Sequence, residues 1–234
     1  MVKYKLKITD IRVEAEGTKS YYLQKPDDFT WEEGAHTHIG LAGFDVGELP
    51  NKNLVRHMSI MTLPEEGKVA FTTRVPGSSS EFKVELSKLQ IGDEVTLFKV
   101  GSRMRLRREG RPIILLSMGV GITTMRPLIL AYSKDNLDIP LLINLNVESA
   151  GEYILQYELD NLVNGNYRNY WVESREEFYQ TLQVMAEKEP QAIYYVVGCD
   201  GFIKDIIGLL RSNHVKDSDI ILDKKVENLP LYFE

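Results

Sequence analysis

Residues 111 to 129 read Arg-Pro-Ile-Ile-Leu-Leu-Ser-Met-Gly-Val-Gly-Ile-Thr-Thr-Met-Arg-Pro-Leu-Ile. The four branched apolar residues from Ile113 to Leu116 predict a strand buried on both faces. Gly119-Val120-Gly121 then predicts a turn into a helix, with Thr123 or Thr124 as the N-cap. The free N–H groups of such a helix suit a phosphate. Because the turn reads Gly-x-Gly-x-x-Thr, and not the full Gly-x-Gly-x-x-Gly, it fits a purely structural strand–helix turn equally well.

The rest of the C-terminal half alternates strands with helices. The sequence predicts strands at 140–147, 169–173, 193–197 and 220–223, and helices at 152–162, 176–188 and 202–211. This alternation predicts an α/β domain with a doubly wound parallel sheet, in which ligands bind at the carboxyl ends of the strands. Gly119 to Gly121 and Gly198 to Gly201 both lie at such ends.

The N-terminal half consists of short strands separated by turns. Strands are predicted at 2–13, 21–23, 36–41, 55–62, 69–75 and 94–100. The segments 55–62 and 69–75 read as a pair joined by Glu65-Glu66-Gly67. One helix is predicted after residue 80, with Phe82, Leu86 and Leu89 on one face. Six strands without parallel crossovers favour a small antiparallel β-barrel.

The boundary between the halves is the run from Arg103 to Arg111, which contains five arginines. We expect two domains, 1–107 and 108–234, joined by a solvated linker. A docking patch for an acidic electron partner is the alternative interpretation of the run.

Composition excludes several classes of protein. The net charge of −6 argues against nucleic acid as a partner. The single cysteine, Cys199, excludes an intramolecular disulfide, a cysteine zinc site and a self-contained iron–sulfur cluster. The alternating N-terminal residues predict a strand instead of a signal peptide, and no apolar run is long enough to cross a bilayer. A cytoplasmic protein without membrane insertion is expected.

Two segments of the N-terminal half could hold an anion. Gly77-Ser78-Ser79-Ser80 precedes a helix, so its N–H groups could bind a phosphate; plain N-capping by Ser79 or Ser80 explains it as well. Arg56-His57-Met58-Ser59 lies in a strand, where a phosphate would supply the partner that a guanidinium needs. A solvated Arg is the alternative. His36 and His38 share a strand face and are expected to be ordinary barrel residues, because no cysteine or carboxylate cluster completes a metal site.

These motifs, in this order and spacing, resemble the ferredoxin–NADP reductase family of flavoproteins along essentially the whole chain. Arg56 to Ser59 is similar to the family's Arg-x-aromatic-Ser/Thr flavin motif, and 76–80, preceded by Arg74, to its second flavin-phosphate motif. Ser117 to Thr124 resembles the Gly-Gly-x-Gly-x-Thr-Pro nucleotide motif, and Val197 to Phe202 the later Cys-Gly-Pro-type motif.

The resemblance implies a flavin held by the barrel, FAD in preference to FMN, and a nicotinamide coenzyme at the parallel sheet. Hydride would pass from the nicotinamide to flavin N5. Ser59 would bond near N5 and Thr123 would contact the nicotinamide side. The remaining implied cofactor-binding residues are Arg56, His57, Met58, Arg74, Gly77, Ser78, Ser79, Ser80, Gly119, Val120, Gly121, Ile122, Gly198, Cys199 and Asp200.

The sequence departs from the family's motifs at several positions. Met58 replaces the aromatic residue, so a thioether contact replaces ring stacking. Met118 and Thr124 replace a Gly and a Pro. Cys199 stands one residue past Gly198, where the family has Pro, so we assign it no catalytic role and expect a buried free thiol.

The acceptor of the electrons stays open at this point. Lacking a cluster, the chain would reduce a separate protein, such as a ferredoxin, a flavodoxin-like protein or an oxygenase component. One alternative is an NAD(P)H-dependent reductase of free flavin or ferric chelates. The other, of a different class, is a nucleotide- or flavin-binding module without redox turnover, which the altered motifs favour.

Two further expectations concern the coenzyme and the C-terminus. The loop after the sheet's second strand carries Glu148 and no basic residue, which favours NADH, with a free ribose hydroxyl, over NADPH. A solvent-facing Glu148 is the alternative, and Arg126, Arg168 or Arg175 could reach the pocket from elsewhere. Tyr232 and Phe233 could cover the flavin, as a C-terminal aromatic does in some relatives; a frayed tail is the alternative.

Overall fold

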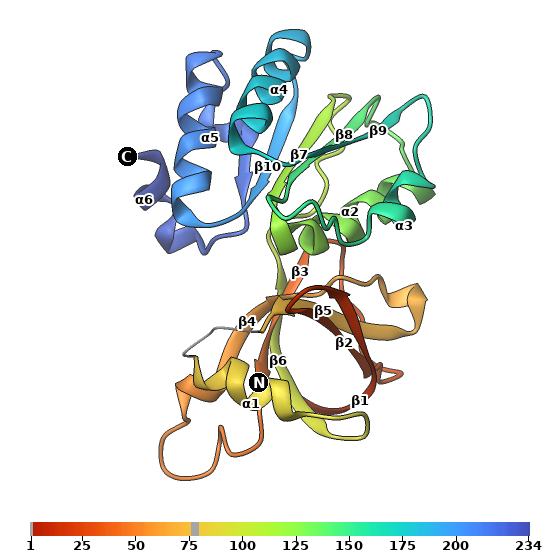
Figure 1. Cartoon of the computed structure of the whole chain (residues 1–234), viewed down its shortest axis with the longest axis vertical. Coiled ribbons are helices and arrows are strands. Elements are labelled where there is room, and N and C mark those ends of the chain that lie inside the picture. Colours follow the sequence, from red (N-terminus) through yellow and green to blue (C-terminus); the bar gives the residue numbers. More distant parts are fainter. Residues whose placement is uncertain (1, 76–79) are drawn as a thin grey trace. The chain divides into compact units, whose positions relative to one another are not determined.

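The computed structural model describes residues 2–75 and 80–234, and the chain divides into two compact units, Met1–Arg105 and Leu106–Glu234 (Figure 1). The sequence predicts this division two residues later. Among the described residues, no helix is both long and apolar enough to span a membrane.

The first unit is a curved sheet in which every pairing is antiparallel. Its order is β4-β3-β6-β1-β2-β5. The strands are β1 (Lys3–Ala15), β2 (Thr18–Gln24), β3 (Ala35–Gly40), β4 (Val55–Ser59), β5 (Lys68–Arg74) and β6 (Glu94–Ser102). The helix α1 (Glu81–Lys88) connects β5 to β6. Alternate residues such as Leu6, Ile8 and Ile39 are buried inside the curve, together with Phe82 and Leu86 of α1. This confirms the predicted barrel-like antiparallel domain.

The predicted pairing of 55–62 with 69–75 is wrong. β4 pairs with β3, and β5 pairs with β2, so these two strands form opposite edges of the sheet. β4 ends at Ser59, and beyond it the Met61 N–H donates to the Ala70 carbonyl at 2.8 Å. No ladder of hydrogen bonds between described residues of β4 and β5 closes the barrel. Alternation of apolar residues predicts that a strand forms, but the strand's partner is decided by long-range packing.

The second unit is a five-stranded parallel sheet in the order β11-β10-β7-β8-β9. The strands are β7 (Ile113–Met118), β8 (Leu142–Val147), β9 (Tyr167–Val172), β10 (Ile193–Val197) and β11 (Ile220–Leu222). The helices are α2 (Ile122–Lys134), α3 (Gln156–Asp160), α4 (Arg175–Lys188), α5 (Asp200–Ser212) and α6 (Pro230–Phe233). α4 and α5 pack together on one face of the sheet, and α2 lies on the other (Figure 1). This confirms the predicted doubly wound fold.

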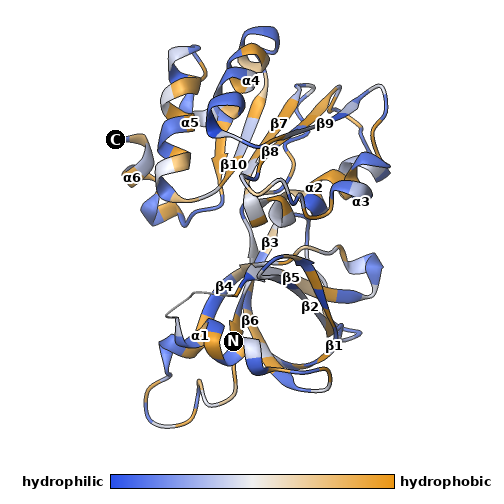
Figure 2. Cartoon of the chain, in the orientation of Figure 1, coloured by the Kyte–Doolittle hydropathy of each residue, from blue (hydrophilic) through white to orange (hydrophobic). Residues whose placement is uncertain are grey.

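The strand β7 lies at the centre of this sheet, and its first four residues are fully buried and strongly hydrophobic (Figure 2). The chain runs from β7 outward through β8 and β9, and then returns to form β10 and β11 on the other side. The order therefore reverses between β7 and β10, which is where open α/β sheets bind their ligands.

The helix predicted over 152–162 is much shorter in the structure. It spans only Gln156–Asp160, because Gly151 and Leu155 both adopt positive φ, at 68° and 64°. A positive φ is incompatible with a right-handed helix, so the segment before Gln156 cannot be helical.

Candidate functional site

Arg56 of β4 lies beside the N-terminus of α1. Its Nη2 donates to the Ser80 hydroxyl at 2.7 Å and its Nη1 to the Val55 carbonyl at 2.8 Å, while the guanidinium lies 5.8 Å from the Phe82 ring centroid. The side chain is half-buried, and no carboxylate of the described residues lies within ion-pair distance. A half-buried cation without an acidic partner, beside free helix N–H groups, fits an anionic phosphate.

Ser80 occupies the N-cap position of α1, but its side chain makes no capping hydrogen bond. The predicted position of Ser80 as the N-cap is confirmed, but its hydroxyl accepts from Arg56 and makes no side-chain capping hydrogen bond. Arg74 is the exposed last residue of β5. Gly77, Ser78 and Ser79 lie outside the described residues.

The other members of the β4 motif alternate across the strand. His57 is exposed, and Met58 packs partly buried against the barrel core. Ser59 lies opposite His36 of β3 in the antiparallel register. The next pair but one in the register is His38 with His57, and since side chains alternate along a strand, these four side chains lie on one face of the sheet.

The sequence prediction missed His57 as a neighbour of His36 and His38. The ring centroids of His36 and His57 are 4.4 Å apart, and those of His38 and His57 are 5.5 Å apart. The described residues contain no group of three His, Cys, Asp or Glu that could hold a metal ion. Burial, with the nearby His57, Arg103 and His38, lowers the pKa of His36 to about 4, so its imidazole is neutral at pH 7.

The glycine turn of the second unit is a single turn of 3₁₀ helix, Gly119–Gly121, leading directly into α2. Gly119 has a φ of +54°, and a Cβ on Gly121 would lie 3.1 Å from Val197. The predicted threonine N-cap is wrong: Gly121 is the N-cap, and Thr123 lies inside the helix, donating from its hydroxyl to the Val120 carbonyl at 2.8 Å. The extra 3₁₀ turn moves the helix start ahead of the threonines.

Asn146 at the end of β8 is a residue that the sequence prediction missed. Its side-chain nitrogen donates to the Ser117 hydroxyl at 2.8 Å and to the Gly119 carbonyl at 3.4 Å, and its side chain is 1% exposed. Asn146 therefore holds the turn against the neighbouring strand. The available signal was the pair of polar asparagines inside the otherwise apolar segment Leu142–Val147.

Glu148 follows β8 and lies over the glycine turn. Its Oε2 atom is 3.1 Å from the position of a Cβ built on Gly119, and its Oε1 accepts from the Ala150 N–H at 3.2 Å. Glu148 is thus half-buried at the ligand edge of the sheet, and the predicted alternative of a purely solvent-facing carboxylate is wrong.

The three arginines considered for the coenzyme pocket differ in their surroundings. Arg126 is 8% exposed and forms a bidentate ion pair with Glu158 of α3, at 2.9 and 2.6 Å. Arg168 is exposed on the edge strand β9. Arg175, at the start of α4, lies with its Nη2 3.6 Å from Met118 Sδ and 3.8 Å from Cys199 Sγ. Of the three, Arg175 is the cation at the carboxyl edge of the sheet.

The segment after β10 provides the second glycine of this edge. A Cβ on Gly198 would lie only 2.3 Å from the Phe202 ring, so glycine is required there. Cys199 is an exposed free thiol at the N-cap of α5. The expected buried thiol is therefore wrong, because the helix begins at Asp200 and leaves the preceding residue at its open end.

The C-terminal aromatics are held against α5. The Tyr232 hydroxyl donates to Asp200 at 2.7 Å, and Arg211 donates to the Phe233 carbonyl at 2.6 Å. Lys224 also donates to Asp200, and these two hydrogen bonds, the Lys224 bond first, lower the pKa of that carboxyl. Both aromatic rings pack partly buried against the core of the second unit, so the alternative of a frayed tail is wrong.

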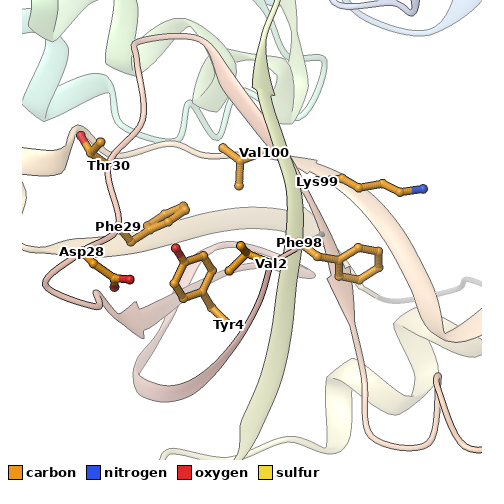
Figure 3. A pocket seen from close by; sticks show the side chains of 8 residues that line it. All are labelled: Val2, Tyr4, Asp28, Phe29, Thr30, Phe98, Lys99 and Val100. Carbon is orange, nitrogen blue, oxygen red and sulfur yellow. The ribbon is translucent and has the colours of Figure 1, made fainter.

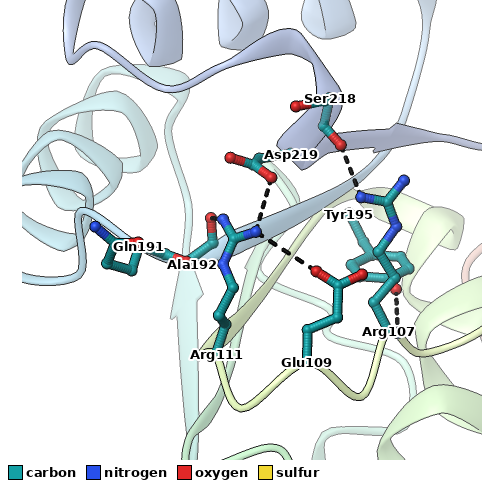
Figure 4. A network of polar contacts seen from close by, with 8 residues as sticks. All are labelled: Arg107, Glu109, Arg111, Gln191, Ala192, Tyr195, Ser218 and Asp219. Carbon is teal, nitrogen blue, oxygen red and sulfur yellow. Dashed lines mark hydrogen bonds and ion pairs between the residues drawn. The ribbon is translucent and has the colours of Figure 1, made fainter.

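The arginine run is not a solvated linker. Met104 and Leu106 are buried, and Arg107, Arg108 and Arg111 hydrogen-bond to backbone carbonyls of the second unit. Figure 4 shows Arg111 between Asp219, at 2.9 Å, and Glu109, at 3.6 Å, with the Arg107 N–H bonded to the Tyr195 hydroxyl. The sequence did not predict this packing, because the run of arginines reads as solvated although buried apolar residues alternate with them.

A cavity of about 240 Å³ lies elsewhere on the first unit (Figure 3). It is lined by Val2, Tyr4, Asp28, Phe29, Thr30, Phe98, Lys99 and Val100. None of the predicted site residues lines it, and it is smaller than the usual range of ligand pockets. The cavity is therefore not a candidate for a dinucleotide.

No protein-family model matches the chain, and no curated protein matches it significantly. Solved structures do match. The ferredoxin NADP+ reductase from Neisseria gonorrhoeae with bound FAD and NADP has a TM-score of 0.78 at 13% identity, covering 94% of this chain and 98% of that one. The ferredoxin reductase in carbazole 1,9a-dioxygenase has a TM-score of 0.77 at 16% identity, covering 95% and 69%.

The flavohem-like FAD/NAD binding domain of nitric oxide dioxygenase from Vibrio cholerae O1 biovar El Tor has a TM-score of 0.70 at 18% identity, covering 94% of this chain and 97% of that one. At such identities a likeness shows the fold. The resemblance predicted from the motifs is thus confirmed at that level: the chain has the two-part fold of the ferredoxin–NADP reductase-like flavoprotein reductases.

Proposed function

We propose that this protein is an NAD(P)H-dependent flavoprotein reductase that passes electrons from a nicotinamide coenzyme, through a bound FAD, to a separate acceptor protein. The observation that carries the proposal is Arg56, a half-buried guanidinium at the N-terminus of α1 that has no carboxylate partner within residues 2–75 and 80–234. Such a cation calls for an anion, and a flavin phosphate supplies one. The matching fold, in a structure with bound FAD and NADP, supports the choice of anion.

The residues of the first unit would hold the flavin. Arg56 and Ser80 would bind its phosphate, with Arg74, Gly77, Ser78 and Ser79 as further phosphate-side residues. Met58 would pack against the ring system, with His57 beside it, and Ser59 would hydrogen-bond near N5. When bound, the flavin supplies the redox chemistry, accepting a hydride and releasing two electrons.

The residues of the second unit would hold the coenzyme. The backbone N–H groups of Gly119 to Ile122 would donate to its pyrophosphate, because the glycines leave the backbone open to a close approach. The Thr123 hydroxyl, which donates to Val120, keeps its oxygen as an acceptor for the nicotinamide side. Gly198, Cys199 and Asp200 would border the same ligand at the next strand, and Tyr232, bonded to Asp200, would lie at the edge of that site with Phe233.

We infer a preference for NADH from Glu148, whose carboxylate lies at the ligand edge and would repel the extra phosphate of NADPH. Arg175 is the opposing group, since it would attract that phosphate. The Glu148 Oε2 atom lies 3.1 Å from a Cβ built on Gly119 of the glycine turn, which is why NADH is favoured.

A separate protein acceptor is inferred because the chain has one cysteine and so cannot carry its own iron–sulfur cluster. Two of the matching structures are described as reductases of an oxygenase and of a cytochrome P450, which supports an acceptor of that kind.

The test begins with the visible spectrum of the purified protein, followed by anaerobic addition of NADH and NADPH separately. A bound flavin that bleaches with either coenzyme is the expected result. Protein that binds neither flavin nor coenzyme would refute the proposal, and flavin that is bound but never reduced would favour a binding module. Turnover with free flavin or ferric chelate as fast as with an oxidised acceptor protein would favour the small-molecule reductase.

A further inference from the structure

Arg126 of α2 and Glu158 of α3 form an ion pair with two hydrogen bonds, at 2.9 and 2.6 Å. We propose that this pair is a positioning element for the coenzyme: it fixes α3 against α2, and thereby holds the loop 148–155 with Glu148 over the glycine turn. The inference rests on the proposed function, because the loop acquires this role only when a nicotinamide coenzyme binds at that edge of the sheet.

The first observation is a guanidinium in an otherwise uncharged, buried part of a helix. All residues from Ile122 to Ile129 are buried, and Arg126, at 8% exposed, is the only one among them that carries a charge. A buried guanidinium is costly unless a carboxylate pairs with it and accepts its hydrogen bonds. Glu158 does so through both carboxylate oxygens, which accept from Nε and Nη2 of Arg126. α2 thus presents one fixed charge, and α3 supplies the group that pairs with it.

The second observation is that α3 cannot hold its own position. It consists of only Gln156–Asp160, and Leu155 before it has a φ of +64°, so the helix does not extend back toward β8. A helix of this length is not stable by itself in water, so its place is set by contacts with other elements. These contacts include the buried side chain of Leu159, the pair of Glu158 with α2, and Asp160, which accepts from Trp171 Nε1 of β9 at 2.9 Å. The Glu158 pair is therefore one of the few groups that locate α3.

The third observation is that both ends of the loop meet the same rigid element. The turn Gly119–Gly121 leads directly into α2, so Arg126 belongs to the helix that begins at this turn. At one end of the loop, Glu148 Oε2 lies 3.1 Å from a Cβ built on Gly119. Just beyond the other end, Glu158 is bonded to Arg126. α2 therefore fixes the loop relative to the backbone N–H groups that would bind the pyrophosphate.

A loop held in this way favours binding of the coenzyme without acting on the chemical step. Ordering a mobile loop on binding costs free energy, so a loop that is already ordered gives tighter binding. The gain is the same before and during hydride transfer, so it lowers the dissociation constant of the coenzyme and leaves the limiting rate of flavin reduction unchanged. A fixed loop also keeps Glu148 at the coenzyme edge, so releasing the loop should reduce the discrimination between NADH and NADPH.

The experiment compares Arg126→Met with Arg111→Met, which removes another partly buried, ion-paired arginine of the second unit. Anaerobic flavin reduction is followed by rapid mixing over a range of NADH and NADPH concentrations, which separates the coenzyme dissociation constant from the limiting rate. We expect Arg126→Met to raise both dissociation constants, that of NADH more, by on the order of tenfold, at an unchanged limiting rate. Arg111→Met should change neither quantity, and Arg126→Lys should restore part of the affinity because it keeps the charge.

The variant Glu158→Gln distinguishes positioning from a simple electrostatic effect. It removes a negative charge where Arg126→Met removes a positive one, so a field acting on the anionic coenzyme would change affinity in opposite directions. Release of the loop would instead weaken binding in both variants. Because Glu158 is the more exposed partner of the pair and Gln can still accept a hydrogen bond from Arg126, this variant provides the measurement if Arg126→Met does not fold.

A second readout does not depend on turnover. Hydrogen–deuterium exchange of the loop 148–155, measured without coenzyme, should be about tenfold faster in Arg126→Met than in the parent protein and unchanged in Arg111→Met. Unchanged exchange of this loop, unchanged coenzyme dissociation constants, or opposite shifts in Arg126→Met and Glu158→Gln would overturn the positioning role alone. Failure of the parent protein to bind or reduce a flavin would overturn the proposed function, and the positioning role with it.

Discussion

The two candidate phosphate sites are built in different ways. In the first unit, the charge of Arg56 stands on a strand edge and faces a hydroxyl. In the second unit, the ligand edge between β7 and β10 is made by backbone and glycine, and the charge that lies over the glycine turn, Glu148, is negative. A full charge gives affinity that depends on one side chain, whereas a backbone site depends on shape. The first arrangement suits a cofactor that stays bound, and the second suits a coenzyme that must leave after each turnover.

The largest effect should follow from removing the charge. Arg56→Ala loses charge-assisted hydrogen bonds worth roughly 1.5–3 kcal/mol, which lowers flavin affinity about tenfold or more. Arg56→Lys keeps the charge but lacks the planar guanidinium, so its flavin affinity should lie between those of the parent protein and Arg56→Ala. Titration of the three apoproteins with flavin measures the three dissociation constants. If the flavin dissociation constant of Arg56→Ala equals that of the parent protein, the first site does not depend on this charge, and the proposed difference between the two sites is wrong.

The backbone site should respond to shape instead. Gly198→Ala would place a Cβ 2.3 Å from the buried Phe202 ring, so we expect about 1–3 kcal/mol of destabilisation through overpacking. The control is Gly201→Ala, whose Cβ would meet nothing within 4 Å and which lies in a helix, so it should be neutral or stabilising. Urea unfolding gives both values, and equal effects would contradict the packing at Gly198.

The histidine face of the first unit should make stability depend on pH. The pKa of His36 is lowered to about 4, so between pH 6.5 and 4 the unfolded chain takes up a proton that the native protein does not. Stability should therefore fall as the pH decreases through this window, by up to about 1.4 kcal/mol per pH unit from this group. His36→Gln should flatten the slope. Urea unfolding at a series of pH values from 7 to 4.5 measures the free energy of unfolding of both proteins. If this free energy falls equally in the parent protein and in His36→Gln, His36 is not the cause.

The smallest effect should be on coenzyme choice. Glu148→Gln removes one repulsive charge at a partly exposed position, so kcat/KM for NADPH relative to NADH should rise about fivefold. Glu152→Gln, an exposed carboxylate of the same loop, serves as the control, and Arg175→Gln should shift the ratio the other way. If the parent enzyme already prefers NADPH, the inferred role of Glu148 is wrong.

The sequence predicted what depends on local periodicity. The buried run Ile113–Leu116 and the strand Ile193–Val197 were recognised because apolar residues there are continuous, and the fold class followed from the order of elements. What failed depends on the third dimension. The β4 and β5 partners, the Ser80 hydroxyl turned toward Arg56 and the exposed Cys199 are set by contacts between distant segments or by where a helix begins.

The same limit applies to the candidate sites. The contact of His57 with the β3 histidines and the role of Asn146 became apparent only when β3 came beside β4 and β7 beside β8, because neither is set by a local motif. Asn146 could have been suspected from its polarity in a buried strand. The contact of His57 with His36 and His38 could not, since the pairing of β3 with β4 is decided by long-range packing.

The anchoring of Arg107, Arg108 and Arg111 to backbone carbonyls also determines how the chain can be dissected. Cutting at residue 112, where the first strand of the sheet begins, would strip three guanidinium groups from the carbonyls of residues such as Leu137, Gln191 and Ser218. A fragment meant to fold alone as the second unit would have to retain the chain from Leu106 onward. Because the acceptors are carbonyls and not carboxylates at most of these contacts, salt and mild acid would not release this segment.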